Sequence, residues 1–374
     1  MRVATNGPFL SGSADRFDEW FHLPIDFVSP DPRVAVRRAR PTEFERIYDA
    51  VDEAFATKRP RAWYDWLYRR NPHGVARCWV VVEEATGRLV ATQAGCPWPL
   101  ASGSRPVAAI LSADWVIAPD WRGRGINEVR REARNAHPWD YASVRIGWPN
   151  ARSGTATSRS SFGDQVHGPI PRAVFLLRPA EYLRRRGWPR RLSAVAGRIT
   201  DATLATWTAL RLDRQFDGTI EPIQQFDSGY DAVTERCMRW EKYWLPHDAA
   251  FLNWRYFAHP VFEYRACAAI VDGAVVGYCV VQVGGERAWL AELAAPSARV
   301  AAAFMRWAIA IAREADCTNF AVYAPPRWRH WQVLRRAGFA RVSSNLFMSL
   351  FASQEPDCQE LDGWQFLAGD IDGL

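Results

Sequence analysis

The chain has 374 residues, of which 48% are hydrophobic and 24% are charged, a balance typical of packed globular proteins that excludes global disorder. At about 150 residues per domain, this length predicts two or three domains. The net charge of +6, from 47 Lys and Arg against 41 Asp and Glu, is too small for the length to indicate a nucleic-acid partner by itself.

The first half of the chain alternates strand and helix patterns, which predicts a mixed α/β lobe. A strand pattern covers Val34–Arg38, and Thr42 with Glu45 has the form of a capping box. The helix that follows places five apolar residues on one face: Phe44, Ile47, Tyr48, Val51 and Phe55. The later patterns predict a helix over 63–68, a hairpin of 79–83 and 89–93, a long strand over 107–118, a helix to about 136 and a strand over 141–146.

Part of this pattern recurs in the second half. Trp66-Leu67-Tyr68 with Pro72 matches Trp254-Arg255-Tyr256 with Pro260 at a constant offset (254 − 66 = 260 − 72 = 188). A second hairpin pattern follows the second copy, over 265–271 and 275–281 around Asp272-Gly273. The recurrence predicts a duplicated lobe.

A basic segment separates the two copies. Arg184 to Arg191 holds five arginines, and a helix pattern with Leu192, Val195 and Ile199 on one side comes next. This segment is interpreted as a solvated helical linker that packs one face on the lobes. The alternative is a surface for a phosphate-rich partner or an anionic membrane.

The most informative segment is the turn after the long strand. Asp114 to Ala118 runs into Pro119 and then into Arg122-Gly123-Arg124-Gly125, where a helix pattern begins. Glycines at such a junction let backbone N–H groups converge, and the helix N-terminus adds partial positive charge. The segment predicts a phosphate or pyrophosphate site, with a tight turn carrying surface arginines as the alternative.

Residues 116–125 resemble the acyl-CoA signature of the GNAT acyltransferase superfamily, R-x-x-G-x-G/A after a strand that ends in V-x-x-P. The chain departs from this signature at Asn127, where the family has a small residue. The resemblance implies an acyl-CoA co-substrate, acetyl-CoA first among the candidates, bound by Val116, Ile117, Ala118, Arg122, Gly123, Arg124, Gly125, Ile126 and Asn127.

A second feature is similar to the end of the next GNAT strand, where the sheet splays apart around the thioester. It runs from Arg145 to Asn150, and Ser153 follows; the resemblance adds Asn150 and Ser153 to the cofactor-binding set. The ending P-N-x-x-S, the string 252–256 and the tail 369–372 resemble GNAT proteins of polysaccharide and amino-sugar pathways. They imply a small-molecule amine, such as an amino sugar or a biosynthetic intermediate, as the acceptor.

The second lobe departs further from the family, because the turn at 295–300 contains no glycine. The fold expected is therefore α/β, with two GNAT-like lobes joined by a helical linker, each with a mixed, splayed central sheet flanked by helices. The expected boundaries are an N-terminal arm over 1–33, an acyl-CoA-binding lobe over 34–178, a basic linker over 179–226 and a degenerate lobe over 227–374.

The resemblance implies direct attack of a neutral amine on the thioester. Asp114 precedes Val116 by two residues and so shares its strand face, which makes Asp114 the candidate base; an aspartate paired with an arginine is the alternative. The family's usual tyrosine acid is missing, because 151–162 contain no Tyr. Tyr64 is the candidate acid instead, with Tyr68 or departure of the unprotonated thiolate as alternatives.

Four other polar residues are further candidates for a functional site. His137 and His167 are alternative bases, although single histidines near helix ends more often have structural roles. Asp370 and Asp372 are candidates for holding a cationic or hydroxyl-rich substrate, although an acidic, solvated tail explains them as well.

The cysteines and apolar stretches bear on compartment and metal binding. The seven cysteines are scattered and never spaced as C-x-x-C, which argues against disulfides and against a metal site. Residues 1–20 show no signal-like apolar region, and the longest apolar stretch, 300–312, is interrupted by Arg306. The protein is expected to be cytoplasmic, without a membrane span.

The sequence is also compatible with two other functions. Tandem GNAT-like proteins of the FemX type transfer aminoacyl groups from tRNA, and the basic segment suits that polyanion. A non-catalytic binding protein with a vestigial fold would explain Asn127 and the missing tyrosine.

Overall fold

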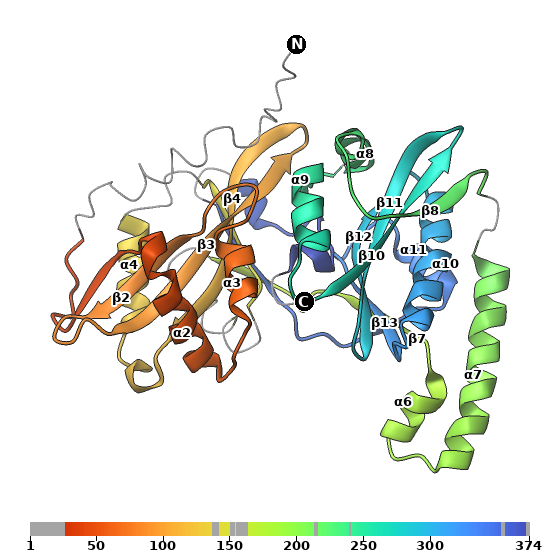
Figure 1. Ribbon diagram of the computed structural model, residues 1–374, viewed down its shortest axis with the longest axis horizontal. Helices are drawn as coiled ribbons and strands as arrows, with labels where there is room; N and C mark the ends of the chain where they lie inside the picture. The colour runs from red at the N-terminus through yellow and green to blue at the C-terminus, as the bar shows by residue number, and fades with distance from the viewer. Residues whose placement is uncertain are drawn as a thin grey trace. The chain divides into compact units, whose positions relative to one another are not determined.

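The computed structural model describes residues 27–136, 142–149, 154, 164–212, 216–238, 241–352 and 356–371. The chain forms two compact units, each with a mixed sheet flanked by helices (Figure 1). The first unit contains Met1–His167 and Phe347–Glu360, and the second contains Gly168–Leu346 and Leu361–Leu374. The expected α/β fold with two splayed-sheet lobes is confirmed.

The first unit is built on the strand order β1-β2-β3-β4-β5-β15-β6. Strands β1 to β4 form an antiparallel meander, and β5 then pairs with β4 in parallel. The strands are β1 (Val34–Arg38), β2 (Arg77–Glu83), β3 (Leu89–Ser102), β4 (Arg105–Ile117), β5 (Val144–Gly147), β6 (Gln165–His167) and β15 (Met348–Ala352). The helices are η1 (Pro41–Glu43), α2 (Phe44–Phe55), α3 (Arg61–Tyr68), η2 (Pro119–Trp121), α4 (Ile126–Ala136) and η4 (Pro356–Gln359).

The apolar periodicity of α2 and α4 explains how these helices pack. The apolar face predicted for α2 is buried up to Val51, whereas Phe55 in the last turn is 48% exposed. In α4, Ile126, Val129 and Ala133 share one face and join the core formed by the sheet. The expected capping box at Thr42 is wrong: a 3-10 turn precedes α2, and the carboxylate of Glu43 accepts the amide of Arg40 instead (3.0 Å).

The second unit repeats this plan with the strand order β14-β7-β13-β12-β11-β10-β8. Its strands are β7 (Arg172–Leu176), β8 (Thr219–Ile223), β9 (Tyr243–Trp244), β10 (Glu263–Val271), β11 (Ala274–Val283), β12 (Arg287–Ala294), β13 (Asn319–Tyr323), β14 (Ala340–Val342) and β16 (Trp364–Gln365). Its helices are α6 (Pro179–Arg185), α7 (Arg190–Arg211), α8 (Gly229–Met238), α9 (Ala249–Leu252), η3 (Asn253–Phe257), α10 (Ala298–Glu314), α11 (Trp331–Ala337) and η5 (Ala368–Asp370).

The sequence repeat corresponds to equivalent elements of the two units. In each, the repeated Trp-x-Tyr string lies in the helical segment before an antiparallel hairpin: α3 before β2 and β3, and η3 before β10 and β11. The tight turn predicted at Asp272-Gly273 is present, with both residues at positive φ. The last strand of each meander also has a break in register, in β4 opposite Thr92–Ala94 and in β12 opposite Val280–Val281.

Each sheet takes one inner strand from a distant part of the chain. In the first unit, β15 lies between β5 and β6, although it follows most of the second unit in sequence. In the second unit, β7 lies between β13 and β14, although it precedes every other strand of that sheet. The expected boundaries at 178 and 227 group β7 with the first lobe and β15 with the second, whereas the compact units group them the other way.

No helix in the described ranges is long and apolar enough to cross a bilayer.

The position of β15 can be tested with a cysteine pair. A Cβ placed on Gly147 of β5 would lie 3.9 Å from the Cβ of Ser349 in β15, which is within the range of native disulfides. We expect the double variant Gly147→Cys, Ser349→Cys to form this disulfide under mild oxidation, with the linked peptides identified by mass spectrometry. The control pair Ser104→Cys, Ser349→Cys, with one cysteine in the β3–β4 turn, should stay reduced. Cross-linking in the control alone would contradict the pairing of β5 with β15.

Candidate functional site

The turn between β4 and α4 has a backbone that requires glycine. Gly123 and Gly125 have φ angles of +75° and +78°, a region that other L-residues rarely adopt. A Cβ on either residue would meet no atom within 4 Å. The requirement therefore comes from the backbone conformation and not from crowding by the protein.

This conformation leaves a group of donors at the start of α4. The amides of residues 123–127 have no hydrogen-bond acceptor among the described residues, whereas the carbonyl of Gly125 accepts from Glu128 and Val129 (both 3.1 Å). Free amides at a helix N-terminus, together with the helix dipole, attract anions. The predicted phosphate site thus has the donors that it needs.

Side chains around the turn hold it in place. Arg122 donates to the carbonyls of Ile117 and Ala54 (both 3.1 Å) and ties the end of β4 to α2. Arg124 lies over the indole of Trp121, 5.3 Å from the ring centroid. Asn127, which replaces the small residue of the GNAT signature, accepts a hydrogen bond from Arg130 one turn along the helix (3.0 Å).

The sheet opens beside this turn. The parallel pairing of β4 with β5 covers Ala109–Ser112, opposite Val144–Gly147, while β4 continues to Ile117. In the part of the chain that the structure describes, this last section of β4 has no strand partner on its β5 side. An amide-containing ligand can pair with such an edge as an added strand would, and Val116 to Ala118 lie along it.

Asp114 lies at the break in register in β4. Its φ of +47° is unusual for a residue with a side chain, and strain of this kind costs about 1–3 kcal/mol and is concentrated at functional sites. The side chain is 4% exposed. One carboxylate oxygen accepts from Nη1 of Arg59 (2.8 Å), and the other accepts from the hydroxyl of Tyr68 (3.0 Å).

The structure joins Asp114 to Tyr68 and not to Tyr64. Tyr64 donates to Asp52 of α2 (2.6 Å) and stacks on Tyr48, with 4.5 Å between ring centroids. Burial raises the pKa of both Tyr64 and Tyr68, and the charge of Asp114 raises it further. Both phenols are therefore protonated at neutral pH.

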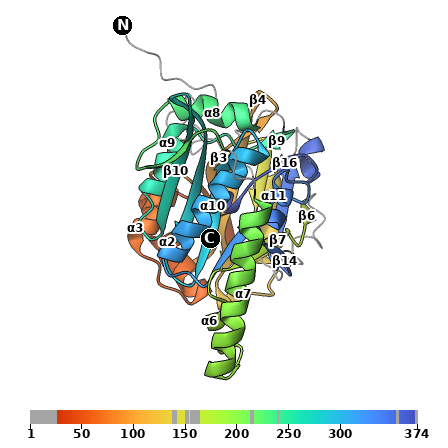
Figure 2. The same cartoon turned by 90° about the vertical axis from the view of Figure 1, so that its right-hand side faces the viewer.

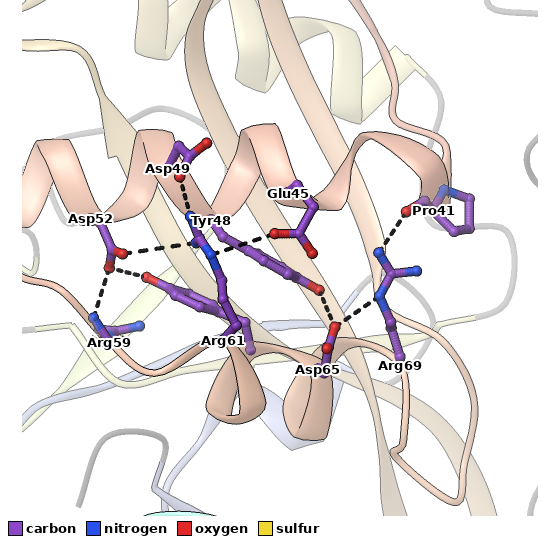
Figure 3. A network of polar contacts seen from close by, with 10 residues as sticks. Pro41, Glu45, Tyr48, Asp49, Asp52, Arg59, Arg61, Asp65 and Arg69 are labelled. Carbon is purple, nitrogen blue, oxygen red and sulfur yellow. Dashed lines mark hydrogen bonds and ion pairs between the residues drawn. The ribbon is translucent and has the colours of Figure 1, made fainter.

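A network of arginines and carboxylates holds α2 and α3 together on the outside of this site (Figure 3). Arg61 of α3 forms ion pairs with Glu45, Asp49 and Asp52 of α2. Asp65 accepts from Arg69 (2.9 Å) and from the hydroxyl of Tyr48 (3.4 Å). These contacts fix the direction in which α3 presents its two tyrosines.

Several predicted residues do not join this site. Asn150, Ser153, His137 and Asp372 lie outside the described residues. The ring of His167 contacts the carbonyl of Gln359 (2.5 Å). Asp370 belongs to the second unit and is 3% exposed, so the interpretation of this residue as part of a solvated tail is wrong.

The second unit has a tyrosine–carboxylate pair at the matching position. The hydroxyl of Tyr256 donates to Glu292 in β12 (2.8 Å), as Tyr68 does to Asp114. Here His247 lies between two carboxylates, 2.8 Å from Glu292 and 2.9 Å from Asp370. The helix that follows β12 differs from α4, because the hydroxyl of Ser297 caps α10 by accepting the amide of Val300 (3.3 Å). Part of the anion-binding potential of that helix end is therefore already used.

The buried histidine predicts a pH dependence of stability. Burial alone would lower the pKa of His247, but the charges of Glu292 and Asp370 outweigh it and raise the pKa to about 10. The folded chain therefore keeps a proton that the unfolded chain loses above its ordinary pKa of 6.5. This stabilisation is complete below about pH 6 and is lost as the pH rises towards 10.

We expect the difference in unfolding free energy between the wild type and His247→Gln to be constant at low pH and to shrink between about pH 7 and 10. Urea denaturation across this range measures it. A difference that grows with pH would show that the histidine is neutral in the folded state.

The chain resembles known proteins in one domain and in its fold. Residues 35–129 match the family model described as an acetyltransferase (GNAT) domain. No curated protein matches the chain. The fold resembles those of solved structures, and three of them are described next. A GCN5-related N-acetyltransferase from Anabaena variabilis has a TM-score of 0.59 at 10% identity, over 85% of this chain and 72% of that one.

The second is a GCN5-related N-acetyltransferase from Kribbella flavida, with a TM-score of 0.56 at 15% identity, over 87% and 72% of the two chains. The third is a protein of unknown function from Enterococcus faecalis, described as a probable N-acyltransferase, with a TM-score of 0.57 at 10% identity, over 84% and 71%. At these identities the structures show the fold alone, whereas the family model covers the β4–α4 turn. The first unit therefore contains a GNAT acetyltransferase domain, over the residues 35–129 that match the family model.

Proposed function

We propose that the first unit transfers an acyl group from acyl-CoA, with acetyl-CoA the first candidate, to a primary amine of a small molecule such as an amino sugar. The observation that carries this proposal is the glycine turn whose free amides adjoin the open edge of β4. A GNAT domain with these two features has both a place for a pyrophosphate and a place for an extended amide chain.

The residues present suit the cofactor. The amides of residues 123–127 would hold the pyrophosphate, and the glycines leave room for it because nothing lies within 4 Å of their Cβ positions. Val116, Ile117 and Ala118 would pair with the pantetheine amides. Arg122 and Arg124 would contribute positive charge, and Arg122 also keeps the turn in shape. The cofactor supplies the activated thioester.

Asp114 is the proposed base. It would take the proton of the attacking amine, directly or through water, as the new C–N bond forms and the C–S bond breaks. The CoA thiolate then leaves and is protonated from solvent. Arg59 and Tyr68 each bind one oxygen of Asp114, and a carboxylate oxygen keeps a second lone pair for the amine. We assign both as positioning residues, because each acts on the reaction through its hydrogen bond to Asp114. Tyr68 is also fully buried.

The role of Tyr64 stays a prediction. Its hydroxyl is fully buried and donates to Asp52, so its use as an acid would require that hydrogen bond to break. Loss of rate in Tyr64→Phe but not in Tyr68→Phe would favour Tyr64.

The cofactor site is tested by calorimetry with acetyl-CoA. We expect micromolar binding by the wild type and a loss of at least a hundredfold in Gly125→Glu, because this change adds a side chain and a negative charge at the phosphate position. Gly103→Glu is the matched control, since Gly103 also has a positive φ and open space around its Cβ. Equal affinity in both variants would overturn the site. Absence of wild-type binding would favour an aminoacyl-tRNA donor or a non-catalytic protein.

The base is tested by following CoA release from acetyl-CoA with a panel of primary amines that includes amino sugars and polyamines. For an accepted amine, Asp114→Asn should lower kcat/KM by about 10²- to 10⁴-fold with acetyl-CoA affinity unchanged. Tyr68→Phe should lower it by less and shift the pH–rate profile. An active Asp114→Asn enzyme would remove Asp114 from the chemistry.

A further inference from the structure

Helices α6 and α7 form a pair within the second unit. In Figure 2, α6 and the adjoining end of α7 extend past the strands β7 and β14. The two helices pack closely, because a Cβ on Gly197 would lie 2.5 Å from the Cα of Ala180. Farther along α7, the hydroxyl of Thr208 donates to the carbonyl of Ala337 in α11 (2.8 Å). These contacts fix which face of α7 is turned inward.

The outward face of α7 is apolar. Trp188 before the helix is 47% exposed, and Leu192, Val195 and Ile199 are 58%, 60% and 63% exposed. Their spacing of four, three and four residues places them in one stripe along a helix. An apolar stripe of this kind is normally buried against a partner.

The charge beside this stripe is entirely positive. The chain has six arginines and no acidic residue between Glu181 and Asp201. Glu181 pairs with Arg184 and Arg185, and Asp201 pairs with Arg313. In the described ranges, Arg190, Arg191 and Arg198 have no ion pair. Arg190 lies two turns before Gly197 and so on the side turned towards α6. We name the four apolar residues together with Arg191 and Arg198, which lie beside the stripe, the α7 face.

We propose that the α7 face binds the surface of a membrane that contains anionic lipid. A stripe of large apolar residues flanked by arginines, with a tryptophan at one end, has the composition of helices that lie in the membrane interface. The apolar side chains would enter the boundary between headgroups and acyl chains, while the arginines extend to the phosphates. The proposal does not depend on the reaction of the first unit.

Charge favours a lipid surface over a second copy of this chain. Two α7 faces brought together would place unpaired arginines of like charge side by side, and like charges oppose such a contact. An anionic surface neutralises them instead, and each arginine adds to the affinity. The rigid packing of α7 on α6 and α11 means that the face is already formed before binding.

The test is sedimentation of the full chain with vesicles of phosphatidylcholine containing about a quarter phosphatidylglycerol, against pure phosphatidylcholine. We expect binding to the anionic vesicles only, weakening as salt is raised. The variant Arg191→Gln, Arg198→Gln should bind about thirtyfold more weakly, and Leu192→Ser, Val195→Ser, Ile199→Ser should lose binding. Both should unfold at the wild-type temperature, because the replaced side chains are exposed.

The matched control removes the same charge elsewhere, with Arg46→Gln and Arg265→Gln, two exposed arginines outside the α7 face. It should bind like the wild type. An equal loss in the control would show attraction by net charge alone and would overturn the proposed face.

Insertion is measured with an environment-sensitive dye on Val195→Cys. All seven native cysteines are buried, so the new thiol is labelled selectively. The dye should shift to the blue with anionic vesicles, while a dye on Ser104→Cys should not. Failure to bind anionic vesicles, or a wild-type dimer that the triple serine variant abolishes, would overturn the proposal; the second result would assign the face to a second copy.

Discussion

The divergence of β4 from β5 is the feature on which the rest of the first unit depends. Parallel pairing stops at Ser112 and Gly147, and β4 continues alone on that side to Ile117. This section ends in the left-handed turn at Gly123 and Gly125, so that the open strand edge and the free amides of α4 adjoin each other. An exposed strand edge and an exposed helix end both offer hydrogen-bonding groups to a ligand. Their occurrence together is the physical reason for assigning a ligand to this place.

The two units share a frame and differ in what surrounds the carboxylate of their last meander strand. Both have a break in register in the last meander strand, and both have a tyrosine that donates to a carboxylate of that strand. In the first unit the carboxylate faces Arg59, and the following helix has free amides. In the second, the carboxylate is bound by His247, and Ser297 caps the helix. At this position the second unit thus has a buried polar cluster around His247.

The exchanged strands β7 and β15 link the folding of the two halves. The sheet of each unit is complete only when a strand from a distant part of the chain has been added next to β5 or β13. Such pairing closes a long loop at an entropic cost, which must be offset by the burial of side chains such as Leu350 and Phe175. The sheet of the first unit is therefore complete only when β15, which follows the segment Gly168–Leu346 in sequence, has been added to it.

The sequence by itself determined the local elements and the position of the cofactor turn. The strand over 34–38, the helix ending at Tyr68, both hairpins and the helix after Gly125 follow from hydrophobic period, turn residues and glycine, which act over a few residues. The duplication was visible for the same reason, because it repeats local patterns at a fixed offset.

The tertiary structure alone decided which side chains meet. Tyr64 and Tyr68 are one helical turn apart, and the residues around them in the sequence do not distinguish them. Only the packing of α3 against α2 and β4 places the hydroxyl of Tyr68 at Asp114 and that of Tyr64 at Asp52. Asp370 resembles a solvated tail residue in sequence, but η5 buries it against His247. The exchange of β7 and β15 has no local signal either, because strands of similar composition can pair with any open edge. These contacts join residues far apart in the chain, and their energies depend on burial and distance, which sequence patterns do not encode.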